Sequence, residues 1–328
     1  MSSPVVSAPR LVDPDELLAL LAIPDADGSG PLTHVERVPA RPGRTAEWPT
    51  WVPAPLRGTL AGRGITAPWT HQSTAARLAY AGTHVVVSTG TGSGKSLAYQ
   101  LPVLATLLTD PRATALYLAP TKALAADQLR ALDALPTQDV RPALYDGDTP
   151  REERDWVRAY SRLVLTNPDM AHRGILPRHD TWSAFLRRLR YVVVDECHTY
   201  RGVFGSHVAQ VLRRLRRVCA RYGSAPVFVL ASATAGDLAT AAGRLTGLPV
   251  TAVTEDGSPR GAVTFALWEP RALPGAAGGL GAMVPRGAGG DAVPVRRSAL
   301  REAADPSSPM WTPDRSGCSW VRSTSPPR

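Results

Sequence analysis

The chain has 328 residues, a formal net charge of +9 and a sequence pI near 10.0, and 44% of its residues are hydrophobic. That length allows one large or two modest domains, and the hydrophobic share argues against disorder throughout. No run of about 18 apolar residues predicts a membrane span, and Met1–Arg10 lacks the pattern of a secretory signal. The positive charge favours polyanionic partners, but an Arg-rich composition gives the same number, so charge alone does not decide.

Two uncommon residue types carry further information. The three cysteines, Cys197, Cys219 and Cys318, form no C-x-x-C pair, which favours a reducing cytoplasm over a disulfide framework or a zinc site. Only two of the 37 basic residues are lysines, Lys95 and Lys122, and both fall in motifs described below. Because lysine is a compact charge on a slim stem and arginine a wide fork, shape is expected to matter at these positions.

The chain begins with a predicted lead-in over residues 1–55. Asp13–Ile23 is a predicted short helix ended by Pro24, and the remainder, rich in Pro, Arg and Trp, is expected to be irregular. Over residues 56–250, apolar runs at 84–88, 115–119, 163–166, 191–195 and 227–231 alternate with helical stretches that include 96–108, 123–135, 151–160 and 203–222. This alternation predicts a doubly wound α/β domain with a mainly parallel sheet and helices on both faces.

The last part of the chain changes character. Residues 251–270 are interpreted as a strand or linker, and residues 271–328 as a low-complexity tail that is disordered. Within the tail, Arg296–Asp305 has helix-forming composition that breaks at Pro306. A frameshift or truncated reading frame near Pro306 is therefore hypothesised, which translation of the other two frames would test.

A phosphate-binding loop is predicted between the run 84–88 and the following helical stretch. Glycines let several backbone N–H groups face one anion, and the helix N-terminus adds positive potential. Lys95 would reach the β and γ phosphates, and the Ser96 hydroxyl would hold Mg²⁺. Thr89 replaces the first glycine of the general G-x-x-x-x-G-K-[ST] pattern; a chance Gly/Ser turn is the disfavoured alternative. The predicted ATP-binding residues here are Thr89, Gly90, Thr91, Gly92, Ser93, Gly94, Lys95 and Ser96.

Another apolar run ends in two adjacent carboxylates, Asp195 and Glu196. In doubly wound folds the carboxyl ends of the strands face the nucleotide crevice. Asp195 would bind Mg²⁺ through the metal's waters, and Glu196 would orient and deprotonate the attacking water. Taken alone, the pair fits a solvated loop as well, but the phosphate loop upstream weakens that interpretation.

Six motifs in order resemble those of superfamily 2 DEAD/DEAH-box helicases. Asp195-Glu196-Cys197-His198 resembles the D-E-x-H box, and the other motifs are the phosphate loop and residues 69–72, 120–124, 166–170 and 232–234. The resemblance covers about Leu56–Trp268 and implies a RecA-like P-loop NTPase domain that uses ATP and Mg²⁺. It also implies that Gln72 reads the adenine edge. The stretch His198–Val208 is similar to YprA/MrfA-like bacterial DNA helicases, which implies DNA rather than RNA as the partner.

Residues for nucleic-acid contact and coupling follow from the same motifs. Thr121, Lys122 and Asn167 would bind phosphates without reading bases, although Thr121 fits a helix N-cap as well. His198 would bond Ser232 or Thr234 and so couple the nucleotide site to the DNA. The arginines of Leu212–Val218 could grip phosphates, but a solvated helix face is the favoured interpretation.

The resemblance also implies a second RecA-like domain that supplies arginine fingers, and nothing after Trp268 resembles one. We therefore expect ATP and nucleic-acid binding with little hydrolysis and no unwinding by this chain alone. The leading hypothesis is the front domain of a cytoplasmic ATP-dependent DNA helicase with a link to DNA repair and no membrane partner. A non-catalytic ATP- and nucleic-acid-binding fragment and an RNA helicase stay open as alternatives. A P-loop ATPase with another substrate is disfavoured by residues 120–124, 166–170 and 232–234.

Overall fold

The computed structural model describes residues 13–22, 31–233, 236–269, 282–283 and 294–295. The chain divides into two compact units: a larger unit, Pro42–Pro259, and a smaller unit that combines Met1–Arg41 with Arg260–Arg328. Most of the predicted tail, including Arg296–Asp305 and the break at Pro306, lies outside the described residues. Within the described ranges, no helix is long and apolar enough to cross a membrane.

The smaller unit is built around an antiparallel ribbon. Strand β1 (Leu32–Val38) pairs with β9 (Val263–Trp268), and Arg41 and Arg260 continue the pairing as an isolated bridge. The predicted first helix is present as α1 (Pro14–Leu21), and the Asp13 carboxylate caps it by accepting the N–H of Asp15 at 3.0 Å. Two further short strands, β10 (Ala282–Met283) and β11 (Pro294–Val295), pair with each other. Strand β1 thus lies where the sequence suggested an irregular lead-in.

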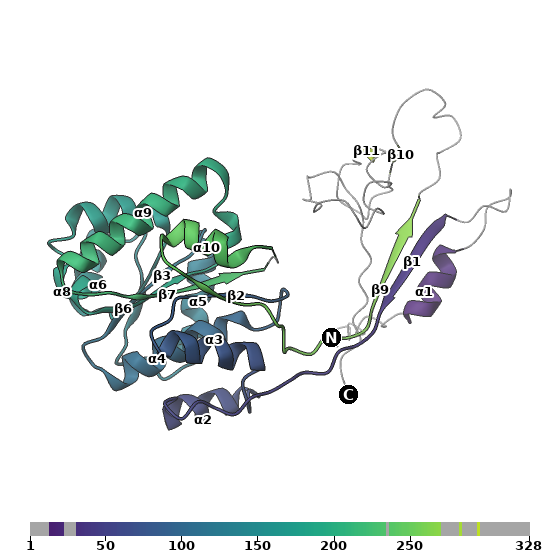
Figure 1. Cartoon of the computed structure of the whole chain (residues 1–328), viewed down its shortest axis with the longest axis horizontal. Helices are drawn as coiled ribbons and strands as arrows, with labels where there is room; N and C mark the ends of the chain where they lie inside the picture. Colours follow the sequence, from purple (N-terminus) through teal and green to yellow (C-terminus); the bar gives the residue numbers. More distant parts are fainter. Residues whose placement is uncertain (1–12, 23–30, 234–235, 270–281, 284–293, 296–328) are drawn as a thin grey trace, which may run out of the picture. The chain divides into compact units, whose positions relative to one another are not determined.

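The larger unit contains a seven-stranded sheet in which every pair of neighbours is parallel (Figure 1). In spatial order the strands are β4 (Pro142–Leu144), β5 (Leu163–Thr166), β3 (Thr114–Leu118), β6 (Leu189–Val194), β7 (Val227–Ser232), β2 (Val85–Ser88) and β8 (Thr251–Val253). The predicted parallel α/β sheet is confirmed. The five apolar runs became β2, β3, β5, β6 and β7.

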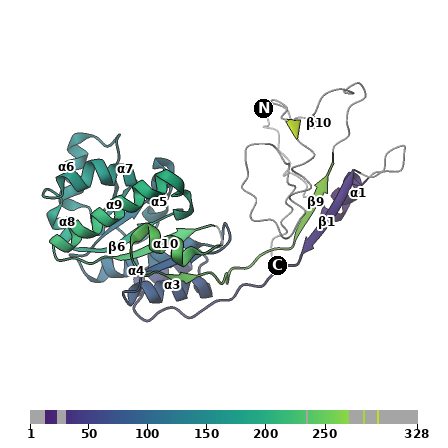
Figure 2. The same cartoon turned by 45° about the horizontal axis from the view of Figure 1, so that its top comes forward.

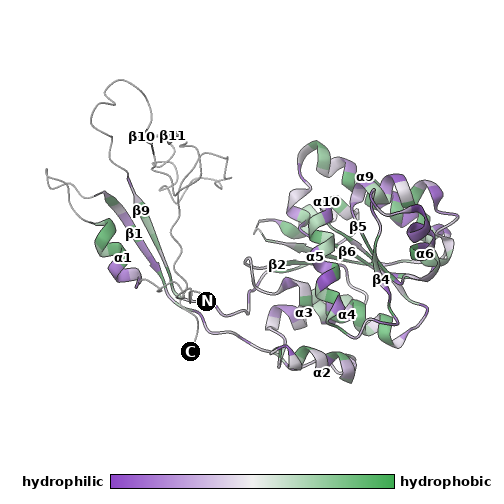
Figure 3. Ribbon diagram, turned by 180° about the vertical axis from the view of Figure 1, so that it is seen from behind, coloured by the Kyte–Doolittle hydropathy of each residue, from purple (hydrophilic) through white to green (hydrophobic). Residues whose placement is uncertain are grey.

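Helices cover both faces of this sheet (Figures 1 and 2). One layer consists of α2 (Ala54–Gly62), α3 (Thr70–Tyr80), α4 (Lys95–Thr109) and α5 (Lys122–Asp133), and the other includes α8 (Ser183–Arg187), α9 (Gly202–Arg221) and α10 (Leu238–Thr246). Alternate strand residues supply the two cores: Ala115 and Tyr117 join the first layer, whereas Leu116 and Leu118 join the second. The strands are therefore mostly apolar on both faces, as Figure 3 shows by their colour.

The larger unit contains further helices and turns in the described residues. They are α6 (Arg151–Tyr160), α7 (Pro168–Met170), and the turns Ala171–Ile175, Leu176–Arg178 and Cys197–Thr199. The strand order decides which connections meet. Because β6, β7 and β2 are neighbours, the segments that follow them lie together at the carboxyl edge of the sheet. The segments that follow β4, β5 and β3 lie together along the other half of that edge.

Candidate functional site

The predicted phosphate loop connects β2 to the first turn of α4. Gly92 and Gly94 have φ of +78° and +77°, a left-handed conformation that favours glycine. The hydroxyls of Thr89 and Ser93 are buried and lie 2.6 Å apart, so they join the two ends of the loop. Thr89 therefore has a structural use at the position where the general pattern has glycine.

Lys95 is held over this loop by backbone oxygens. Its Nζ donates to the carbonyls of Thr89 and Gly90, each at 3.0 Å. The ammonium group is only partly buried. Because both acceptors are neutral carbonyls, phosphate oxygens would compete well for the same N–H donors, since hydrogen bonds between charged groups are the stronger ones.

Gln72 connects α3 to the phosphate loop. Its side chain is buried: Oε1 accepts the N–H of Trp69 at 2.7 Å, and Nε2 donates to the Gly94 carbonyl at 2.9 Å. A Cβ on Gly94 would lie 2.6 Å from Nε2 and would displace this amide, so glycine favours the contact. In the structure Gln72 braces the loop, and its contact with adenine stays a prediction.

The two predicted acids follow β6 directly. Asp195 is 9% exposed, and its Oδ1 accepts the N–H of Glu196 at 2.9 Å. Glu196 has φ of +46° and ψ of +42°, which a non-glycine residue adopts at a cost of about 1–2 kcal/mol. The Glu196 carbonyl accepts both the N–H and the hydroxyl of Thr199, at 2.9 and 2.8 Å, and these bonds hold the strained turn.

Two tyrosines that the sequence analysis did not single out contact Asp195. Tyr99 of α4 donates to Asp195 Oδ2 at 3.3 Å, and the hydroxyl of Tyr117 in β3 donates to the same oxygen. Burial, followed by the negative charge of Asp195, raises the pKa of Tyr99 far above its ordinary value, and burial does the same for Tyr117. Tyr99 lies one turn beyond Ser96 in α4, the helix that begins at the phosphate loop. Its bond to Asp195 therefore connects this helix to the acid pair.

His198 lies between the acid pair and the end of β7. Its Nδ1 is 3.1 Å from Glu196 Oε2 and accepts the backbone N–H of Ala233 at 3.5 Å. The first contact needs a hydrogen on Nδ1 and the second needs a lone pair there, so the two contacts compete for one nitrogen. Of the two expected hydroxyl partners, Ser232 ends β7 directly before Ala233, and Thr234 lies outside the described residues, so those contacts stay predictions.

The thiol of Cys197 is enclosed by the same elements. Burial, with smaller contributions from Asp195 and Glu196, raises its pKa to about 12. At pH 8 only about one thiol in ten thousand would be ionised, and the thiolate is the reactive form. We expect iodoacetamide to label Cys197 in the folded chain at least about a hundredfold more slowly than in denaturant. The rate should climb with pH well beyond 9. Peptide mapping by mass spectrometry measures this, and fast native labelling at pH 8 would contradict the raised pKa of this half-buried thiol.

The predicted nucleic-acid residues follow β3 and β5. The Thr121 hydroxyl accepts the N–H of Leu124 at 3.3 Å and caps α5, which realises the alternative interpretation of this residue. Asn167 Oδ1 caps α7 by accepting the N–H of Met170 at 2.8 Å. Lys122 Nζ lies 2.5 Å from Asp148 Oδ2 in an exposed ion pair, which raises the Lys122 pKa. Both helices begin at the same edge of the sheet, so the backbone N–H groups of their first turns lie there as well.

The arginines of α9 are partly committed to structure. Arg213 donates to the carbonyl of Arg244 at 2.7 Å, and Arg216 donates to those of Thr246 and Gly247 at 3.0 and 2.9 Å. These carbonyls close the last turn of α10, where positive charge is favourable. For these two residues the contacts with α10 account for the position, and they differ from both the solvated face and the phosphate contacts considered for the cluster.

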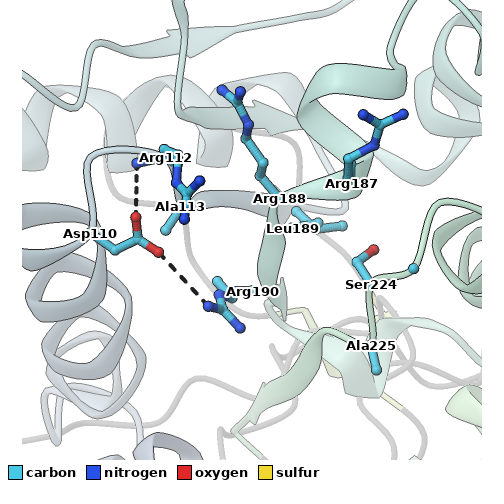
Figure 4. A pocket seen from close by; sticks show the side chains of 10 residues that line it. Asp110, Arg112, Ala113, Arg187, Arg188, Leu189, Arg190, Ser224 and Ala225 are labelled. Atoms are coloured by element: carbon cyan, nitrogen blue, oxygen red, sulfur yellow. Dashed lines mark hydrogen bonds and ion pairs between the residues drawn. The ribbon is translucent and has the colours of Figure 1, made fainter.

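A cavity of about 650 Å³ lies at the opposite, amino edge of the sheet (Figure 4). Asp110 accepts the N–H of Arg112 at 2.9 Å and lies 3.8 Å from the guanidinium of Arg190. The guanidinium groups of Arg187 and Arg188 point away from Asp110 in Figure 4. The cavity is lined by the segments that precede β3, β6 and β7, so it is separate from the loop and the acid pair.

Comparison with known proteins agrees with this geometry. Residues 69–241, just over half of the chain, match the DEAD/DEAH box helicase family. The chain belongs to the DEAD/DEAH box helicase family. The matched range includes Gln72, the phosphate loop, the acid pair and Ser232.

Individual helicases resemble the chain over a wider range. It is 41% identical over 251 residues to the ATP-dependent helicase YprA of Bacillus subtilis, covering 76% of the chain and 34% of YprA. The ATP-dependent helicase HRQ1 of Saccharomyces cerevisiae is 44% identical over 63% of the chain and 20% of its own length. A crystal structure of the DUF1998 helicase MrfA bound to DNA and AMPPNP has a TM-score of 0.75 and 40% identity over 79% of this chain and 36% of that one. The chain thus spans about a third or less of these helicases.

Proposed function

We propose that the chain is the ATP-binding front domain of an ATP-dependent DNA helicase. The observation that supports the proposal is the hydrogen bond from Tyr99 to Asp195, because Tyr99 lies one turn beyond Ser96 in the helix that begins at the phosphate loop. The phosphate loop and the acid pair, far apart in the sequence, are thus joined through one side chain. The relationship to MrfA, whose crystal structure contains DNA and AMPPNP, supports ATP and DNA as the ligands.

ATP binding would use groups that already face the loop. The backbone N–H groups of residues 90–95 and the start of α4 would receive the phosphates. Lys95 would exchange the carbonyls of Thr89 and Gly90 for phosphate oxygens. The hydroxyl and carboxylate oxygens of Ser96 and Asp195 are hard donors that fit Mg²⁺. When bound, Mg²⁺ would neutralise charge on the β and γ phosphates.

Hydrolysis would depend on Glu196. Its carboxylate would orient the attacking water and accept its proton. The left-handed backbone at Glu196 sets the direction in which the side chain leaves the main chain. A hydrogen bond from Thr199 holds this backbone in place. DNA would lie along the other half of the carboxyl edge, where Thr121, Lys122 and Asn167 follow β3 and β5. Lys122 would then leave Asp148 for a phosphate.

The test is a titration of a fluorescent ATP analogue with Mg²⁺, followed by single-turnover hydrolysis with and without single-stranded DNA. The proposal expects Mg²⁺-dependent binding and a rate that DNA increases more than RNA of the same sequence. Binding with no hydrolysis under any condition would favour the non-catalytic fragment. Greater stimulation by RNA would favour an RNA helicase. Absence of Mg²⁺-dependent nucleotide binding would contradict all three.

His198 is proposed to couple the two halves of the edge through its contacts with Glu196 and Ala233. In His198→Ala, nucleotide affinity is expected to stay within about twofold, because no phosphate contact is lost. Stimulation of hydrolysis by DNA should fall about tenfold, which is the effect of losing one charge-assisted hydrogen bond. Single-turnover rates with and without single-stranded DNA measure the stimulation. Unchanged stimulation in the variant would exclude this role.

A further inference from the structure

Two buried phenols meet one carboxylate oxygen in the larger unit. Tyr99 and Tyr117 are each 4% exposed, and both donate to Asp195 Oδ2. They reach it from different elements, because Tyr99 lies in α4 and Tyr117 in β3, where it is paired with Val193 of β6. The two rings also contact each other, with centroids 5.8 Å apart.

We infer that Tyr99 and Tyr117 are positioning residues that fix the Asp195 carboxylate for Mg²⁺ binding. The inference rests on the proposed function, since it concerns the same cation. An ionised carboxylate has about four lone-pair sites. The two phenols and the N–H of Glu196 take three of these sites, which leaves about one for a metal-bound water.

This arrangement fixes the orientation of the Asp195 carboxylate before Mg²⁺ binds. A carboxylate as buried as Asp195 is costly without hydrogen bonds, so each hydroxyl lowers the free energy of the ionised form. The donors come from a helix and a neighbouring strand, which restricts rotation of the carboxylate. Hydrogen-bond partners of metal ligands typically contribute 10- to 100-fold to metal affinity.

A role in core packing alone makes a different prediction, because phenylalanine would fill the same space. Tyr191 supplies the matched control. It lies in β6, belongs to the same core layer as Tyr99 and Tyr117, and is 5% exposed. Its hydroxyl accepts from Thr106 at 3.4 Å and makes no hydrogen bond with Asp195 in the part of the chain that the structure describes. Tyr191→Phe therefore removes a buried hydroxyl without altering the carboxylate.

The experiment measures the Mg²⁺ dependence of nucleotide binding by the full chain. A fluorescent ATP analogue is titrated in EDTA and at increasing Mg²⁺ for the parent chain, Tyr117→Phe, Tyr99→Phe and Tyr191→Phe. In Tyr117→Phe the Mg²⁺ concentration for half-maximal enhancement should rise about tenfold. Tyr99→Phe should show a smaller rise, about threefold, because its contact is longer. Affinity in EDTA and the value for Tyr191→Phe should stay within about twofold of the parent.

The outcomes separate the two proposals. If the parent chain shows Mg²⁺-dependent binding but Tyr117→Phe and Tyr99→Phe do not change its midpoint, the positioning role is overturned and the proposed function stands. An equal shift in Tyr191→Phe, or an equal loss of affinity in EDTA, would also overturn it in favour of packing. If the parent chain shows no Mg²⁺ dependence, both proposals fail. Thermal unfolding of each variant identifies any loss of fold independently.

Discussion

Lys95→Ala is expected to lower the affinity of the chain for ATP by about 10- to 100-fold. A charge-assisted hydrogen bond contributes about 1.5–3 kcal/mol, and each 1.4 kcal/mol is about tenfold in affinity. The alanine removes the only charged group that contacts the loop carbonyls in the described residues. Titration with a fluorescent ATP analogue at saturating Mg²⁺ measures the change. An arginine at this position should not restore affinity, because its wide planar guanidinium differs in shape from the compact ammonium group of lysine.

Lys122→Ala is the matched control for this experiment, because Lys95 and Lys122 are the two lysines of the chain. Lys122 is exposed and paired with Asp148, away from the phosphate loop. Its removal should leave ATP affinity within about twofold, since its ion pair is exposed to solvent and lies outside the loop. An equal loss in both variants would point to the net charge of the chain and would contradict a specific role for Lys95.

Glu196→Gln is expected to slow single-turnover hydrolysis by about 10²- to 10⁴-fold, the usual contribution of a general base. The amide keeps the shape of the side chain but cannot take a proton from water. Nucleotide affinity should change by less than about threefold, because Glu196 would act on the water and not on the phosphates. Rapid-quench measurements at saturating concentrations, with single-stranded DNA present, give the rate of hydrolysis.

The outcome that contradicts this role is a Glu196→Gln variant with parental hydrolysis. A fall in affinity equal to the fall in rate would instead assign Glu196 to binding. Because glutamine meets the same left-handed backbone at φ +46°, the variant should not add strain. Matching thermal unfolding of the parent and the variant checks this.

Much of the sheet could be predicted because its strands are buried on both faces. The runs that became β2, β3, β5, β6 and β7 are apolar at successive residues, and the alternating helices predict parallel pairing. The motif residues follow those strands, so their common edge was predictable as well. The order of the strands was not, since it depends on packing between residues far apart in the chain. The roles of Lys95, Ser96, Asp195 and Glu196 stay predictions that the geometry supports.

Other features depend on contacts that local sequence does not contain. The ribbon of β1 and β9 pairs residues more than two hundred positions apart, and β1 is too polar to mark itself as a strand. Tyr99 and Tyr117 read as ordinary core residues, although the i, i+3 spacing of Ser96 and Tyr99 puts them on one helix face. One of the two partners of His198 is the backbone N–H of Ala233, which no side-chain motif records.

The bridge between Arg41 and Arg260 has a consequence for how the gene could be rearranged. These residues exchange two backbone hydrogen bonds, at 2.8 and 2.9 Å, immediately outside the two ends of the larger unit. The two ends of residues 42–259 are therefore close together, as the ends of an inserted domain are. A foreign domain with closely spaced termini should be exchangeable at this junction while the register of the flanking ribbon is kept.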